Sequence, residues 1–185
     1  MQFFTKTLLA AALCTFGYSA NSQFQYHQEG GVSLFVSPSA FCPVGTYWAR
    51  LNVYQLNDEV AFSASAIPSL GGYFNSQTGG YLGLDLPVTI DANIGNRATD
   101  DSGSSFGGFA GLGYGFNLMV GSGSSKSHGV VFQAGIRTEF EFRGVDRRLT
   151  LRASYLLGSS EVDPLTQESP NPSVVGIGLL YGLGY

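Results

Sequence analysis

Paired carboxylates and arginines recur at alternate positions along two neighbouring segments of the chain. Glu139 and Glu141 lie two residues apart, so on a β-strand both side chains face the same way, as the two carboxyl groups of a glycosidase could. Arg137 precedes them at the same spacing, and Arg148 and Arg152 follow on the next segment. Because buried charges require partners of opposite sign, we interpret these residues as a neutralising network rather than a catalytic pair.

Three other patterns approach known chemistry without completing it. Ser127 and His128 are a nucleophile and a base, but adjacent residues on a strand point to opposite sides. The Gly- and Ser-rich segment 121–127 lacks the glycine that precedes the lysine of a phosphate loop. A segment that begins at Asp91 lacks the glutamate that completes a calcium loop. We therefore expect no catalytic, cofactor-binding or metal-binding residues, and no enzyme.

The composition fits one domain with an unusual surface. Of 185 residues, 12% are charged and 26 are glycine, whereas soluble domains average about 25% charged residues. Aromatic residues make up 14% and the net charge is only −4, which excludes a disordered chain. Nine lysines and arginines oppose thirteen acidic residues, so we expect no nucleic-acid partner.

The N-terminal segment has the pattern of a secretory signal peptide. A lysine precedes an uncharged run over residues 8–16, and small residues follow. We predict a signal peptide over residues 1–22 and a barrel domain over residues 23–185. Cys14 lacks the small preceding residue of a lipoprotein signal, and its removal leaves Cys42 without a partner for an intrachain disulfide.

The elements that would position the charged residues are β-strands. Over residues 130–142, apolar side chains alternate with polar or small ones, which is the period of a strand. No transmembrane helix is expected, because no sufficiently long apolar run follows the signal peptide. The same alternation predicts eight strands, over residues 30–37, 46–56, 58–67, 80–93, 106–119, 129–143, 147–158 and 173–185.

Eight antiparallel strands could form a soluble lipocalin-like barrel or a membrane barrel, which have opposite polarity. One face is nearly continuous Leu, Val, Ile, Ala and Phe, which is too bulky for the interior of eight strands. We therefore predict an all-β, eight-stranded, up-and-down transmembrane barrel whose polar face lines the lumen. The charged lumenal residues would be Arg50, Asp85, Asp91, Arg137, Glu139, Glu141, Arg148 and Arg152, with Arg143 and Glu59 completing five positive and five negative charges.

Loop lengths predict the orientation of the barrel, because outer-membrane barrels have short periplasmic turns and longer outer loops. The shortest links, at residue 57 and at residues 144–145, are predicted to be periplasmic, as are both termini. The link 94–105 falls at the same end, although it is long for a periplasmic turn. The predicted outer loops are 38–45, 68–79, 120–128 and 159–172.

Several strand segments resemble those of small bacterial outer-membrane β-barrel proteins, the eight-stranded class that includes OmpA-like and OmpX-like barrels. The matching segments are Leu84-Asp85-Leu86-Pro87, Phe106-Gly107-Gly108-Phe109 through Gly115, Ala134-Gly135-Ile136-Arg137 and Ala153-Ser154-Tyr155-Leu156-Leu157. The resemblance implies the outer membrane of a Gram-negative-type bacterium. It also implies that Tyr185 is a terminal insertion signal for the barrel-assembly machinery. The resemblance differs from full-length OmpA in one respect, since we identify no peptidoglycan-binding domain in the sequence.

We expect a monomeric, non-enzymatic protein that contacts outer-membrane lipid and has a plugged polar core. Its work would be structural or would depend on interactions of its outer loops. The alternative is a small channel or a ligand-carrying barrel with a partly hydrated lumen.

Overall fold

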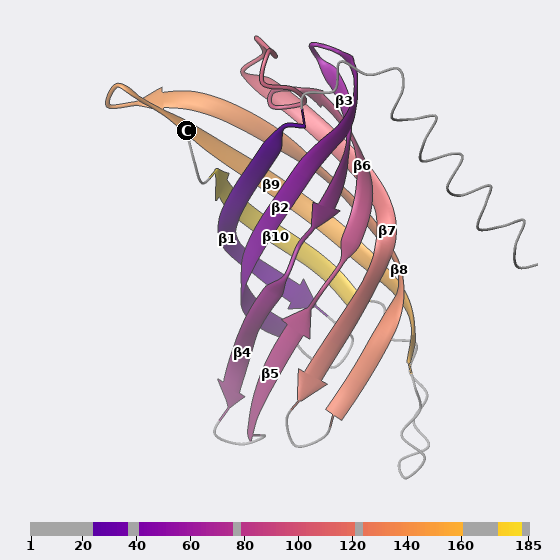
Figure 1. Cartoon of the computed structure of the whole chain (residues 1–185). Helices are drawn as coiled ribbons and strands as arrows, with labels where there is room; N and C mark the ends of the chain where they lie inside the picture. The colour runs from indigo at the N-terminus through magenta and orange to yellow at the C-terminus, as the bar shows by residue number, and fades with distance from the viewer. Residues whose placement is uncertain (1–23, 37–40, 76–78, 121–123, 161–173, 183–185) are drawn as a thin grey trace, which may run out of the picture.

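A computed structural model describes residues 24–36, 41–75, 79–120, 124–160 and 174–182. These residues form one antiparallel sheet that closes into a barrel (Figure 1). Among them, no helix is long and apolar enough to cross a membrane. The strands are β1 (Tyr26–Val36), β2 (Phe41–Asn57), β3 (Val60–Ala66), β4 (Ser69–Asn75), β5 (Gly79–Asp85), β6 (Val88–Gly95), β7 (Phe106–Val120), β8 (Ser124–Phe142), β9 (Val145–Ser160) and β10 (Val174–Gly182).

The ten strands occupy eight positions around the barrel, and we call each position a wall. β3 and β4 together form one wall strand, because β2 pairs with both of them, and β5 and β6 form the next, because β7 pairs with both. β1 pairs with β10, from Glu29 opposite Gly182 to Val36 opposite Val175, and this ladder closes the ring. The fold is an eight-stranded antiparallel up-and-down barrel, which confirms the fold predicted from the alternation.

Proline interrupts two of the wall strands. β3 gives way to β4 at Pro68, and β5 gives way to β6 at Pro87. Proline has no backbone N–H, so each break removes one donor from the ladder. The neighbouring groups keep their register, since the Ile67 N–H donates to the Pro87 carbonyl at 3.0 Å and the Tyr47 N–H to the Pro68 carbonyl at 2.9 Å. The wall therefore continues through both breaks.

The strands at one end of the barrel are longer than predicted. Residues 68–79 were predicted as an outer loop, but most of them belong to β4 and the start of β5. Residues 120–128 likewise include the start of β8, and residues 38–45 include the start of β2. The loop predictions were wrong here because Gly, Ser and Tyr residues hide the alternation of apolar and polar side chains. The strands continue nevertheless, since backbone pairing requires no hydrophobic pattern.

Side chains that point away from the barrel axis are nearly all apolar. Leu70, Ile90 and Leu112 are each more than half exposed. At the outward positions of the described strands, the charged side chains are Lys126 and Arg147, which lie near opposite ends of adjacent strands. A wide apolar belt therefore surrounds the barrel between these two positions.

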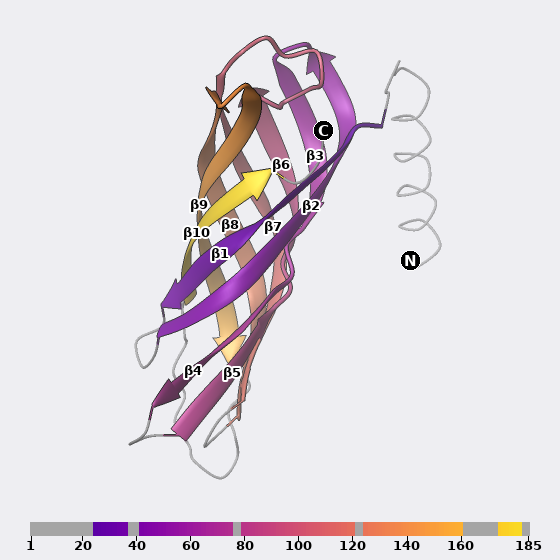
Figure 2. The ribbon, with the colours of Figure 1, turned by 90° about the vertical axis from the view of Figure 1, so that its left-hand side faces the viewer.

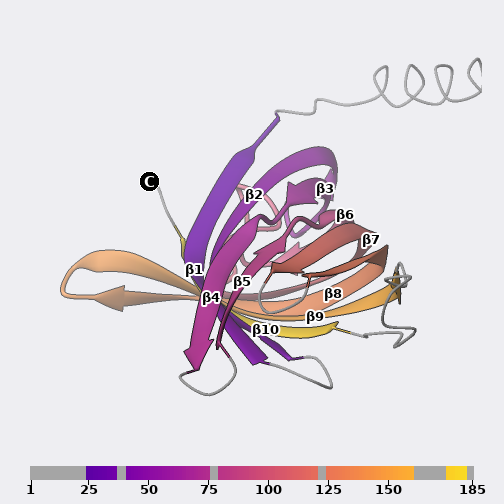
Figure 3. The ribbon, with the colours of Figure 1, turned by 90° about the horizontal axis from the view of Figure 1, so that it is seen from below.

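Side chains that point inward fill the lumen, around which Figure 3 shows the strands arranged. One apolar cluster consists of Trp48, Ile67, Phe109 and Leu180. Leu180 is fully buried, and it is the large side chain among the inward glycines 176, 178 and 182 of β10. A second cluster, which we call the apolar layer, lies in the half of the lumen farthest from residues 96–105 and consists of Phe35, Cys42, Val44, Val131, Leu156 and Val174.

Candidate functional site

A hydrogen-bonded group around Asp91 occupies the middle of the lumen. The Gln133 amide nitrogen donates to Asp91 Oδ1 at 2.5 Å and to Thr89 Oγ1 at 2.7 Å. The Ser65 hydroxyl donates to the other Asp91 oxygen. Arg152 Nε donates to the Gln133 side-chain oxygen at 2.7 Å, so Gln133 links a buried cation to a buried anion.

A second group joins two arginines from opposite walls. Arg50 on β2 and Arg137 on β8 both donate to Asn93 Oδ1, at 2.8 and 2.9 Å. The Asn93 amide nitrogen donates to Ser63 Oγ at 2.9 Å, which fixes the direction of the amide. Arg137 Nε also lies 3.7 Å from Glu29 Oε1, which supplies a negative charge.

Aromatic rings enclose the Arg137 guanidinium. Its central carbon lies 4.9 Å from the centre of the Trp48 ring and 4.4 Å from the centre of the Phe109 ring. These distances are within the range of cation–π attraction. Gly135 makes room for Phe109, because a Cβ at Gly135 would lie 2.5 Å from the ring. Cation and rings together occupy this part of the lumen.

Residues 96–105, which we call the cap, arch over one end of the barrel in Figure 2. Asn52 donates to the Ala98 carbonyl at 2.8 Å, and Arg50 donates to the Arg97 carbonyl at 2.6 Å. The Asp100 N–H donates to Gln25 Oε1 at 3.0 Å. The cap accounts for the unexpected length of the predicted 94–105 link: its backbone closes the lumen.

Glu139 and Arg148 of the predicted network form an ion pair at the rim of the cap. Arg148 Nε lies 3.5 Å from Glu139 Oε1, and both side chains are about a quarter exposed. Asn96 of the cap donates to the other Glu139 oxygen at 3.0 Å. This pair therefore helps to attach the cap to β8 and β9.

The predicted network is only partly contiguous. Arg50, Asp91, Arg137 and Arg152 lie in the buried groups and Glu139 and Arg148 at the rim, whereas Asp85 lies farther from the cap, where Asn117 donates to it at 3.3 Å. Glu141 is exposed, because the β8–β9 hairpin extends beyond the ring of strands (Figure 3). In this part of the hairpin, side chains on the inward face of the strand are outside the lumen. Tyr185 lies outside the described residues.

Of the two remaining positions in the predicted charge balance, Arg143 differs from expectation and Glu59 does not. Arg143 is exposed in the turn after β8 and has a positive φ of 57°, so its lumenal placement was wrong. Glu59 accepts a hydrogen bond from Ser102 of the cap at 3.0 Å. Glu29 was missed, since the predicted first strand began at residue 30 and two consecutive glycines there hide the alternation. Extending the alternation back from Ser33 to Glu29 would have found it.

The side chains that could have supported catalysis do not meet. Ser127 is buried on the inward side, whereas His128 faces outward and its Nδ1 lies 2.5 Å from the Tyr114 hydroxyl. Within the described ranges, no group of three or more His, Cys, Asp or Glu side chains could hold a metal ion. The geometry of the lumen is that of a packed polar core, in which Arg50, Asp91 and Arg137 have partners from more than one strand.

Comparison with known proteins gives the same architecture. No protein-family model and no curated protein sequence matches the chain. Among solved structures, Neisserial surface protein A superposes with a TM-score of 0.53 at 13% identity, over 89% of this chain and 98% of that protein. Ail, the attachment invasion locus protein of Yersinia pestis, also gives a TM-score of 0.53 at 13% identity, over 87% of this chain and 98% of Ail. The chain therefore has the eight-stranded β-barrel fold of the small bacterial outer-membrane proteins.

Proposed function

We propose that this protein is an integral, non-enzymatic outer-membrane barrel with a closed lumen, which acts structurally or through the loops at its outer end. The outward apolar belt supports a membrane location, because a water-soluble barrel would place charges on that surface. The sheet also closes on itself through the β1–β10 ladder, which suits a lipid environment, where open sheet edges do not occur. The predicted signal peptide and the terminal Tyr185 would direct the chain to the barrel-assembly machinery.

The filled lumen is the single observation that favours this role over that of a channel. Arg137, Arg152 and Asp91 are at most 2% exposed, and each is hydrogen-bonded to a side chain from another strand. At Gly111, a Cβ would lie within 1.8 Å of the Asp91 carboxylate, so even a methyl group would not fit there. The cap closes the end of this packed region.

The outer loops are then the parts available to external partners. They connect the strand ends opposite the cap, and residues 161–173, between β9 and β10 in the sequence, lie outside the described residues. Ail, which shares the fold, was solved with the heparin analogue sucrose octasulfate. That likeness supports testing whether the outer loops bind external partners. We expect the purified protein to act as a monomer in such tests.

Electrophoresis and fractionation test the membrane assignment. We expect the protein in the outer-membrane fraction, and a different mobility in SDS gels before and after boiling, because a closed barrel resists detergent. Recovery as a stable water-soluble monomer without detergent would contradict the membrane assignment.

Planar bilayers test the closed lumen. The purified barrel should give no stable, defined conductance steps. A variant with alanine at Arg137, Arg152 and Gln133, if it shows the same heat-dependent mobility, is the positive control, since it removes the side chains that fill the cross-section. Defined steps from the unaltered protein would favour the channel instead.

A further inference from the structure

The boundary between β2 and β4 has the shortest ladder among the described strand pairs. These strands pair only from Val44–Gly71 to Thr46–Ser69, although β2 reaches to Phe41 and β4 to Asn75. By contrast, β7 and β8 pair without a break from Phe106–Thr138 to Val120–Ser124. We call the β2–β4 boundary the seam.

Proline explains why the seam is short. In an antiparallel pair, alternate residues exchange two N–H···O bonds. On the side of β2 that faces β4 these residues are Tyr47, Gly45 and Pro43, because the Tyr47 N–H donates to the Pro68 carbonyl. Pro68 cannot return a bond to Tyr47, and Pro43 cannot donate at the third position. Only the Gly45–Leu70 pair keeps both donors.

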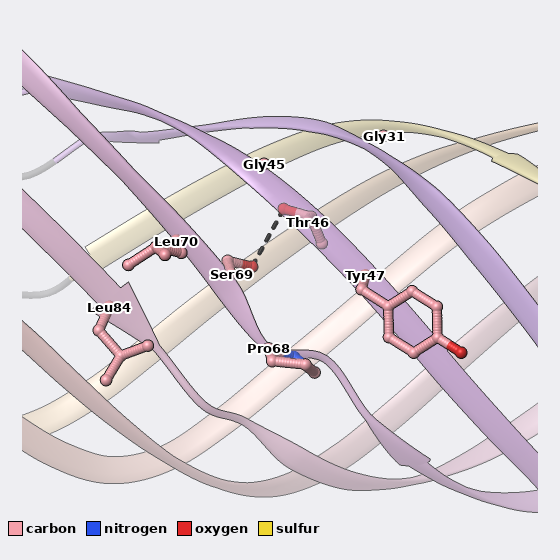
Figure 4. A pocket seen from close by; sticks show the side chains of 8 residues that line it. All are labelled: Gly31, Gly45, Thr46, Tyr47, Pro68, Ser69, Leu70 and Leu84. Atoms are coloured by element: carbon pink, nitrogen blue, oxygen red, sulfur yellow. Dashed lines mark hydrogen bonds between the residues drawn. The ribbon is translucent and has the colours of Figure 1, made fainter.

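An apolar groove lies on the outside of the seam (Figure 4). It has a volume of about 350 Å³, and its walls include Tyr47, Pro68, Leu70 and Leu84. Gly45, which points outward between larger residues, leaves the hollow. The groove is continuous with the apolar belt, since Leu70 is 58% exposed.

The apolar layer lies directly behind the seam. Val44 and Cys42 of β2 belong to it, and glycines face them from β4 and β5. A Cβ at Gly71 would lie 2.9 Å from a Val44 methyl group, and a Cβ at Gly83 would lie 3.2 Å from the Cys42 sulfur. The surfaces on both sides of this part of the barrel are therefore apolar, and Gly71 and Gly83 place no side chain between the strand backbone and the apolar layer.

Buried hydroxyl groups hold the base of the seam. Thr46 Oγ1 donates to Ser33 Oγ on β1 at 2.7 Å and lies 3.0 Å from Ser69 Oγ on β4. These contacts connect three walls just below the point at which the backbone ladder ends. An opening between β4 and β2 would therefore extend along the strands only as far as Thr46.

We propose that the seam opens laterally and admits the acyl chain of a membrane lipid from the groove to the apolar layer. The proposal rests on the membrane location proposed above. An acyl chain suits the path because both surfaces are apolar and the groove opens onto the belt that would face lipid. The structure represents the closed seam, and opening requires the loss of few backbone bonds.

Cys42 is a reporter already in place behind the seam. The protein, purified from membranes, is inserted in phosphatidylcholine vesicles and treated either with a maleimide attached to a fatty acyl chain or with a charged, water-soluble maleimide. Mass spectrometry locates the modified cysteine. The matched control is Cys42→Ala with Val131→Cys, which places a thiol in the same apolar layer behind the continuous β7–β8 ladder.

The acyl maleimide should modify Cys42 at least about tenfold faster than the cysteine at position 131, because opening of the seam breaks fewer bonds. The double variant Pro43→Val and Pro68→Val, which restores two donors, should slow this reaction by about tenfold. Equal rates at the two positions, no reaction of Cys42, or faster reaction with the charged reagent would overturn the seam proposal. Failure of the untreated protein to insert or to show heat-dependent mobility would instead contradict the membrane assignment.

Discussion

The Arg137 guanidinium packs against the ring of Phe109, with its central carbon 4.4 Å from the ring centre, inside the barrel. Arg137 comes from β8 and Phe109 from β7, and the facing wall supplies Glu29 at 3.7 Å. The cation is therefore held by a ring on its own side of the lumen and by a carboxylate from the opposite side. It connects walls that the backbone ladders do not connect directly.

Replacing Arg137 should destabilise the barrel strongly. We expect Arg137→Met to lower the free energy of unfolding by about 3–5 kcal/mol, because Glu29 loses the partner of its buried charge. Urea unfolding in lipid vesicles measures the change, and Arg143→Met in the exposed turn is the control, with an effect below roughly 0.5 kcal/mol. Adding Glu29→Gln to Arg137→Met should recover part of the loss, and strictly additive losses would show that the two residues are not coupled.

The outward face of β8 allows a test of membrane depth. Ile136 and Phe142 both face outward on this strand and are about half exposed, but Phe142 lies at the end of the hairpin. Ile136→Arg should cost about 2–4 kcal/mol, whereas Phe142→Arg should cost less than about 1 kcal/mol, since the penalty falls towards the membrane surface. Equal costs in vesicle unfolding experiments would contradict a membrane that surrounds the middle of β8.

Gln133 tests the central polar group. Gln133→Asn shortens the side chain, so it can no longer reach both Asp91 and Arg152, and we expect a loss of about 1.5–3 kcal/mol. The control is Gln28→Asn, because Gln28 accepts one exposed hydrogen bond, from the Tyr47 hydroxyl at 2.8 Å. Chemical denaturation of both variants measures the difference, and a larger effect at Gln28 would contradict the buried bridge.

Trypsin can test the attachment of the cap. The bond after Arg97 should resist cleavage, because Ala98 is buried and the Arg97 carbonyl accepts a bond from Arg50. The bond after Arg143 should be cut readily, which provides an internal control in an exposed turn. Asn52→Ala removes the bond to the Ala98 carbonyl and should speed cleavage after Arg97 by roughly tenfold. Rapid cleavage at Arg97 in the unaltered protein would show that the cap is not attached in solution.

The alternation of side chains predicted the barrel because each wall strand has one apolar and one polar or small face. It also identified Arg50, Asp91, Arg137 and Arg152, since each lies within a strand whose phase is set by many neighbours. It failed for Glu141 and Arg143, because the period continues along a hairpin after the lumen has ended. A sequence period gives the phase of a strand, whereas the extent of the lumen depends on where neighbouring walls stop.

The cap and the apolar layer could not be predicted in the same way. Residues 96–105 have no period, and their position depends on carbonyl groups that accept bonds from Asn52 and Arg50, which are distant in sequence. The apolar layer combines inward residues such as Val131 and Leu156, which depart from the polar pattern of their own strands. Only the register of β8 with β9, which places these two side by side, makes them neighbours.

Trp48 gives this protein an intrinsic optical signal from its interior. It is the single tryptophan of the chain, it is 1% exposed, and its ring lies 4.7 Å from that of Phe109. A tryptophan on the outer surface would report contact with lipid, whereas Trp48 reports the packing of the lumen itself. Its fluorescence can therefore report closure of the barrel, since the contact between Trp48 of β2 and Phe109 of β7 joins two strands that are not neighbours in the sheet.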